Sequence, residues 1–279
     1  MSIFLGFMAA LLWGIHDFFV RIVTRQIHIY TAIVIVFFAS SLLLLALIWS
    51  ADVSLEIKSG GIMLGCLSGM TFAAATVALY NAFALGPVRV VASIIGAYPI
   101  FSVILAFLQG ANIRLEQMLA VLAVIIGVSF VASGSDKSYQ QQGQPKAILW
   151  SVIACLAFSV CFHLGQAAAT LAHILALNLI VRSSALIILL IFGFFKLNFQ
   201  NLNLKILPYL VFLAILDTLA LALVTGAGHF RDPQYASVAA STFGMMTIIL
   251  AWIFLKERLS GQQWLAVSVV FGAILFLGL

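Results

Sequence analysis

Charged and polar side chains interrupt the first apolar stretch of the sequence. Trp13, Asp17 and Arg21 follow one another at intervals of four residues, so a helix would present all three on one face. In one interpretation Asp17 forms an ion pair with Arg21, whose long side chain extends to the polar edge of the stretch. In the other, Asp17 and its neighbour His16 face an internal cavity and bind a substrate or a proton. Both interpretations stay open, because the residues around His16 are apolar on every side.

Two further charges lie deep within apolar stretches of the second half. Asp217 has no opposite charge within one helical turn, so it needs water or a partner from another segment. Arg182 is the natural partner, because it is the one cation that the sequence places deep in an apolar segment. The pair is expected either to join two helices or to contact a polar substrate directly. A buried carboxylate of this kind can also exchange protons near neutral pH, which would link it to a proton gradient.

Composition indicates the surroundings of these side chains. Of the 279 residues, 65% are hydrophobic and 8% are charged, with a mean hydropathy of +1.23, whereas soluble domains average about 25% charged residues. We therefore expect an integral, multi-pass membrane protein. A hydrocarbon core about 30 Å thick needs roughly 20 apolar residues for each helical crossing. The sequence supplies ten such segments: 3–22, 28–49, 60–85, 88–108, 115–133, 147–170, 174–195, 206–228, 234–254 and 262–279.

Several kinds of partner and site are not expected. The net charge of +5 comes from Lys and Arg that lie mostly between apolar segments, which is typical of membrane anchoring and not of a nucleic-acid partner. Cys66, Cys155 and Cys161 lie within apolar segments and show no CxxC or Cys/His spacing. Neither a disulfide framework, nor a metal site, nor another cofactor is therefore predicted. The motifs HExxH and GxSxG are absent, and no two carboxylates lie close together in an apolar segment, so the chain is not expected to be an enzyme.

The chain divides into two halves that resemble each other weakly. A polar stretch at 133–146 separates five apolar segments from five more, which predicts repeats at 1–133 and 147–279 joined by a linker at 134–146. A shift of 146 residues lays Pro87 on Pro233. Because each half contains an odd number of segments, tandem copies must enter the membrane in opposite orientations, as in the inverted repeats of many secondary transporters. The substrate path would then lie between the halves.

Glycine and proline predict how two of the helices pack and bend. Three glycines recur at four-residue intervals along the third apolar segment: Gly61, Gly65 and Gly69. They let a neighbouring backbone approach closely, so this helix is expected to be internal. Pro99 lies within the fourth segment and should kink it. Its counterpart after the 146-residue shift is Met245, so the two halves are not expected to bend alike.

Short motifs in both halves resemble the EamA-like branch of the drug/metabolite transporter superfamily. The second half has AWIFLKERLSGQQWLAV at 251–267, after a helix that opens with DPQYASVAAS at 232–241. The first half has YNAFALGPVRVVASIIGAYPIFSVILAF at 80–107 and an early Trp-Gly pair. The resemblance covers essentially the whole chain and implies an all-α membrane fold of ten helices in two inverted five-helix repeats. One departure is Ala111, which stands where the second half has Glu257, so a mechanism that needs a symmetric pair of glutamates is not expected.

The resemblance also places cavity-lining helices in the third and fourth segments. Tyr80, Asn81 and Tyr98 lie there, and a cavity-lining role and a helix-packing role are equally open for them. His163 is expected to hydrogen-bond a neighbouring helix or else to line the cavity and relay protons. The candidate substrate-binding or coupling residues are therefore Trp13, His16, Asp17, Tyr80, Asn81, Tyr98, His163, Arg182 and Asp217.

The resemblance and the buried charges together predict a secondary transporter, with export as the expected direction. The substrate is expected to be a small polar metabolite such as an amino acid, or an amphipathic drug-like compound. Alternating access of the two halves would move it across a bacterial inner (plasma) membrane, and proton coupling is one option. The expected partners are a small-molecule substrate, the lipid bilayer and, if coupled, protons. A passive channel or a non-transporting membrane scaffold is the alternative, ahead of an intramembrane enzyme.

Orientation stays open at this stage, because two arguments disagree. The distribution of Lys and Arg between the segments places both termini outside by the positive-inside rule. Relatives in the superfamily are commonly described with cytoplasmic termini.

Overall fold

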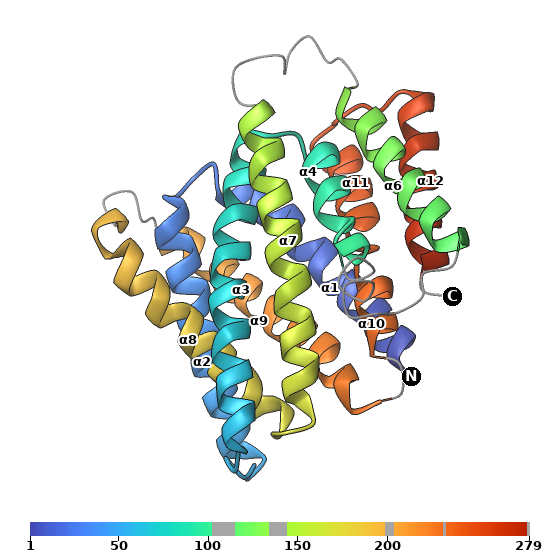
Figure 1. Ribbon diagram of the computed structural model, residues 1–279. Coiled ribbons are helices and arrows are strands. Elements are labelled where there is room, and N and C mark those ends of the chain that lie inside the picture. Colours follow the sequence, from blue (N-terminus) through green and yellow to red (C-terminus); the bar gives the residue numbers. More distant parts are fainter. Residues whose placement is uncertain (102–114, 134–143, 199–203, 231–232, 278–279) are drawn as a thin grey trace.

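The computed structural model describes residues 1–101, 115–133, 144–198, 204–230 and 233–277, and these residues are almost entirely helical. Helices are what an apolar chain must form in lipid, because the hydrocarbon offers no partner for backbone N–H and C=O groups. The α-helices are α1 (Ser2–Val23), α2 (Ile29–Ser50), α3 (Ser59–Leu85), α4 (Val88–Gly96), α6 (Leu115–Ser133), α7 (Gln144–Ala169), α8 (Ile174–Gly193), α9 (Leu207–Gly226), α10 (Gln234–Ala240), α11 (Phe243–Phe254) and α12 (Gly261–Leu277) (Figure 1). Short 3₁₀ turns occupy Phe194–Lys196, Leu204–Ile206 and Ala227–His229.

Seven of the described helical segments are long and apolar enough to cross a membrane. They are α1, α2, α3, α7, α8, α9 and the pair α10–α11, and a shorter apolar segment, made of α4 and the turn after it, covers Val88–Phe101. These seven correspond to seven of the ten predicted segments, so the prediction of a multi-pass helical membrane protein is confirmed. The rest of the fourth predicted segment and most of the predicted linker lie outside the described residues.

The closest packing joins helices from opposite halves of the chain. Helix α3 of the first half lies against α7 and α8 of the second half, and α2 also packs on α8. Helix α1 crosses to α9, α10 and α11, while α4 pairs with α11. Helices α6 and α12 lie side by side at one edge of the molecule (Figure 1). The middle of the molecule is thus built from α1, α3, α4, α7, α9 and the α10–α11 pair.

The glycines of α3 allow this close packing. A Cβ atom at Gly65 would lie 3.0 Å from the Ile180 side chain, and one at Gly69 would lie 2.5 Å from the Val181 carbonyl oxygen. Small residues allow such approach where lipid supplies no hydrophobic driving force between helices. The prediction that this helix is internal and admits a neighbouring backbone is confirmed, and the neighbour is α8.

Both halves contain a broken helix near the centre. Helix α4 ends at Gly96, and a turn at 97–98 precedes Pro99, as a proline requires of the residues before it. A turn at 241–242 separates α10 from α11 without a proline. There the Ser241 and Thr242 hydroxyls each donate, over 2.7 Å, to a carbonyl three residues earlier, which competes with helical hydrogen bonding. Both halves are therefore broken within about two residues of equivalent positions, but only the first break lies beside a proline.

The two broken helices cross with their backbones in contact. A Cβ atom at Gly96 would lie 3.0 Å from the Ser241 carbonyl oxygen, and one at Gly244 would lie 2.7 Å from the Ala92 carbonyl oxygen. Close to the crossing, the Tyr98 hydroxyl donates to the backbone carbonyl of Ser237. The crossing therefore directs Tyr98 toward the second half of the chain.

Glu257 connects the halves at one end of the same helix pair. Its carboxylate accepts a hydrogen bond of 3.2 Å from the backbone N–H of Val88, the first residue of α4. A negative charge at a helix N-terminus satisfies an otherwise unpaired donor and complements the helix dipole. Ala111, its counterpart in the first half, lies outside the described residues.

Candidate functional site

Charged side chains from three helices meet in the middle of the molecule. Asp217 on α9 accepts a hydrogen bond of 2.9 Å from the Trp13 indole N–H on α1. Its second carboxylate oxygen lies 2.7 Å from Nη1 of Arg182 on α8. The predicted pairing of Arg182 with Asp217 is thus present, and the two side chains are 0% and 6% exposed.

Arg182 is held away from the space between the halves by two aromatic rings. Its guanidinium carbon lies 4.4 Å from the centre of the Phe72 ring and 5.3 Å from that of Phe37. Cation–π attraction of this kind is strongest where water is excluded. The guanidinium therefore lies against two aromatic rings as well as against the Asp217 carboxylate.

His16 and Asp17 form a second buried pair on α1. His16 Nδ1 lies 2.8 Å from the Asp17 carboxylate, and both residues are 3% exposed. His16 Nε2 has no hydrogen-bond partner among the described residues. Arg21 is buried as well, and its Nη1 donates to the backbone carbonyl of Phe83 at the end of α3. The interpretation in which Arg21 extends to the polar edge is wrong, because this carbonyl holds it inside the bundle.

A small cavity lies between the two halves, and groups from both pairs border it. Its volume is about 20 Å³, which is room for about one water molecule. Both carboxylates reach it, although the chain separates them widely and the sequence offered no close pair. The cavity is lined by Trp13, His16, Asp17, Phe72, Thr76, Leu79, Tyr98, Phe158, Phe162, Asp217 and Phe243.

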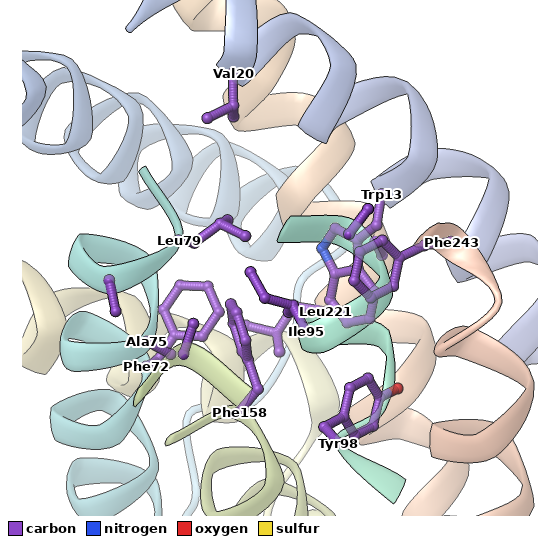
Figure 2. Close-up of a cluster of buried hydrophobic side chains, with 14 of the residues drawn as sticks. Trp13, Val20, Phe72, Ala75, Leu79, Ile95, Tyr98, Phe158, Leu221 and Phe243 are labelled. Atoms are coloured by element: carbon purple, nitrogen blue, oxygen red, sulfur yellow. The ribbon is translucent and has the colours of Figure 1, made fainter. Parts of the chain in front are cut away.

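Aromatic rings make up most of the remaining wall. The Phe162 ring stacks on Trp13 with centroids 5.2 Å apart and on Phe158 at 5.5 Å, and Tyr98 meets it edge-on at 5.2 Å. Figure 2 shows Trp13 beside Phe243, and Phe72 beside Phe158, in the same cluster. These phenylalanines could not be singled out from the sequence, because 23 phenylalanines in an apolar chain carry no signal that separates four of them.

The other candidates lie at different distances from the cavity. Tyr80 is fully buried, its ring centre lies 6.4 Å from that of His16, and its hydroxyl has no hydrogen-bond partner within the part of the chain that is described. Asn81 donates to the Val77 carbonyl of its own helix over 2.7 Å. It lines a separate, open pocket of about 860 Å³ near the ends of α1 and α8.

The structure does not bring His163 to the cluster. His163 is exposed on the outer side of α7, although its neighbour Phe162 points into the cavity. Successive residues of an α-helix are rotated by about 100°, and on α7 this rotation turns His163 outward while Phe162 points inward. Hence, of the nine candidates, the structure gathers Trp13, His16, Asp17, Tyr80, Tyr98, Arg182 and Asp217, and it leaves out Asn81 and His163.

Metal chemistry finds no support in the part of the chain that the structure describes, where no three His, Cys, Asp or Glu side chains are placed to hold an ion. The arrangement instead offers two carboxylates, one imidazole and several aromatic faces around a closed space. These groups can bind a small molecule or hold a proton.

Comparison with known proteins gives two findings. The model of the EamA-like transporter family matches residues 1–133 and 145–279. A crystal structure whose description names no function has the same fold, with a TM-score of 0.72 and 15% sequence identity over 99% of this chain and 96% of that chain. Such low identity is informative about the fold alone. A search of curated proteins finds no match to the chain.

Proposed function

Because the chain belongs to the EamA-like transporter family, and is thus a membrane transporter of the drug/metabolite transporter superfamily, we propose that it exports a small polar metabolite such as an amino acid, or an amphipathic drug-like compound, by alternating access. The observation that carries this proposal is the buried cluster of Trp13, His16, Asp17, Arg182 and Asp217 around a closed cavity. Charges within a membrane-spanning bundle each cost about 2.5–3.5 kcal/mol on insertion scales, so their presence favours a function.

An inverted repeat of five helices in each half accounts for the helix packing. Under the 146-residue shift α1 corresponds to α7 and α3 to α9, so the contact of α3 with α7 has its counterpart in the contact of α9 with α1. Both pairs run antiparallel. The N–H of Lys58 donates to the Leu171 carbonyl while Gly86 lies against Ala147. Such pairing supports ten crossings related by a two-fold axis, in the bacterial inner membrane that we predict.

The size of the cavity supports a closed state of the transport cycle. A space for about one water cannot hold a metabolite, so the halves have to separate before substrate enters. The crossing of the broken helices offers a natural pivot, because irregular backbone at membrane depth is tolerated where it lines a cavity. Rocking about this crossing would expose the carboxylates first to one side and then to the other.

Flux across the membrane of proteoliposomes tests the proposal. Vesicles loaded with a metabolite mixture and given a pH gradient should move at least one solute against its concentration gradient. Asp17→Asn and Asp217→Asn should each lower the pH-dependent rate, because each removes a carboxylate from the cavity wall. Unchanged pH-dependent flux in both variants would reject their role in coupling. A passive channel would only equilibrate the solute, and a scaffold would move none.

A further inference from the structure

We infer that the open pocket near the ends of α1 and α8 binds the phosphate headgroup of an anionic phospholipid, with Lys196 as its main charge partner. The pocket is separate from the closed cavity in the middle of the molecule. This lipid would therefore bind whichever solute the protein transports.

Segments from both halves of the chain form the pocket. Its volume is about 860 Å³, within the range of about 300–1,000 Å³ that ligand sites occupy. The Thr31 hydroxyl near the start of α2 donates to the Asn198 carbonyl over 2.9 Å and accepts from the Asn198 N–H over 3.1 Å. These reciprocal hydrogen bonds hold the segment after α8 against α2. The pocket thus has fixed walls.

The walls of the pocket carry positive charge and no negative charge. Lys196 Nζ lies 5.0 Å from the centre of the Tyr30 ring and 3.4 Å from the Tyr30 hydroxyl, so the ring holds the ammonium group in place. No carboxylate among the described residues forms an ion pair with Lys196, and none of the described lining residues is Asp or Glu. An anion would therefore meet the ammonium charge without competition.

Other polar groups of the pocket suit a phosphate. Asn81 gives one hydrogen of its amide nitrogen to the Val77 carbonyl over 2.7 Å, which leaves the second hydrogen for a ligand. The His28 ring lies 6.3 Å from the Tyr30 ring, and it adds a second positive charge whenever it is protonated. Phosphate oxygens accept several charge-assisted hydrogen bonds at once, so they match this set of donors.

The pocket borders an apolar surface that faces lipid. Phe195 lines the pocket and is 97% exposed, and Ile191 and Phe192 at the end of α8 are exposed as well. A phospholipid whose phosphate lies at Lys196 would place its acyl chains along these side chains. A free phosphate or a soluble phosphate ester would leave them without that contact. This apolar border is why we assign the pocket to a lipid.

Cations gather at the end of the bundle where the pocket lies. Asn81 belongs to the last turns of α3, and the first turn of α7, which carries Lys146, packs on the end of that helix. Lys256 and Arg258 flank Glu257, which binds the start of α4 at the same end. Basic pockets between transmembrane helices are sites for anionic lipid headgroups, because the basic surface attracts those lipids.

Three probes test the ligand class in the purified, full-length protein in a neutral detergent. They are dioleoyl-phosphatidylglycerol, dioleoyl-phosphatidylcholine with the same chains and no net charge, and glycerol 3-phosphate with the phosphate and no chains. Titration followed by native mass spectrometry should show one phosphatidylglycerol bound about tenfold more tightly than phosphatidylcholine. Equal binding of the two lipids overturns the inference. Glycerol 3-phosphate binding as tightly as phosphatidylglycerol would show that a soluble phosphate ester is the ligand.

Three variants test the position. Lys196→Gln should weaken phosphatidylglycerol binding by about fivefold or more, since it removes one cation from the site. Lys196→Arg should bind within about twofold of the unmodified protein. Lys146→Gln, the same neutralisation at an exposed position at this end but outside the pocket, is the matched control and should also stay within twofold. Equal losses in Lys196→Gln and Lys146→Gln would mean diffuse attraction to the basic surface and would overturn the assignment to this pocket.

Thermal unfolding gives a second measurement of the same site. A lipid that binds only the folded protein should raise the unfolding midpoint by about 2–4 °C or more at saturation. Lys196→Gln should unfold at the unmodified midpoint without lipid, because its side chain is exposed, and should lose most of the rise that phosphatidylglycerol produces. A full rise in Lys196→Gln would place the lipid elsewhere.

Discussion

At the scale of single residues, the buried charges of Asp217 and Arg182 are stable because each has a partner that matches it. Asp217 receives both the Trp13 indole N–H and the Arg182 guanidinium, and Arg182 also lies against two phenylalanine rings. Without its partner, an ion at this depth would bear the full cost of desolvation. Replacing one member of the pair is therefore expected to destabilise the protein more than replacing both.

Arg182→Met should lower the free energy of unfolding by about 3–5 kcal/mol, because it leaves Asp217 buried without a counter-charge. Adding Asp217→Asn should recover most of that loss, since no unpaired ion then remains. Denaturant unfolding in detergent, followed by circular dichroism, measures both. Lys58→Met at an exposed position is the control and should change the value by less than about 0.5 kcal/mol. A double variant no more stable than Arg182→Met would contradict this account.

At the scale of helices, the crossing of the two broken helices determines how the halves meet. Gly96 and Gly244 bring backbone against backbone, and the turns beside them release the helices from regular hydrogen bonding. The neighbouring Tyr98 hydroxyl and the Glu257 carboxylate add hydrogen bonds between the halves. Packing at this point is too close for an additional carbon atom.

Gly244→Ala should destabilise the protein by about 1–3 kcal/mol, because its Cβ would lie 2.7 Å from the Ala92 carbonyl oxygen. The matched change is Gly272→Ala in α12, where a Cβ would meet nothing within 4 Å. There alanine should be neutral or stabilise by up to about 1 kcal/mol, since it favours a helix more than glycine does. Thermal unfolding of the two variants side by side checks the difference. Equal midpoints would show that the crossing tolerates a wider separation.

At the scale of the whole molecule, the structure is closed around its centre. Trp13 is 6% exposed at the cavity, whereas Trp49 is 88% exposed near the end of α2. Helices of the two halves pack against each other around the cavity, whose volume of about 20 Å³ leaves room for about one water molecule. Exposure of Trp13 therefore reports on the state of the molecule.

A variant that keeps Trp13 and replaces the other four tryptophans by phenylalanine should show emission protected from acrylamide in the absence of a substrate. Addition of a transported solute should increase quenching, because turnover opens the cavity. Stern–Volmer constants measured with and without the solute give the change. The complementary variant Trp13→Phe should show no solute-dependent change. High quenching without any solute would contradict a closed resting state.

Much of the architecture was predictable because it depends on local chemistry. Apolar runs of about 20 residues predict membrane helices, and the glycines of α3 predicted an internal helix. The Arg182–Asp217 pair was predictable by elimination, since few charges lie deep in the apolar segments. Proline predicted the break in the first half. The break before Phe243 depends on hydroxyl groups and packing, which no single residue type indicates.

The sequence by itself determined that this is a multi-pass membrane protein of the EamA-like kind and which charges must be sheltered. Only the tertiary structure decided which side chains shelter them. In a helix that is apolar all round, the pattern does not show which face points inward, so His163 and Phe162 could not be told apart. Trp13 binds Asp217 because α1 lies against α9, and that contact between distant segments exists only once the two halves have packed together.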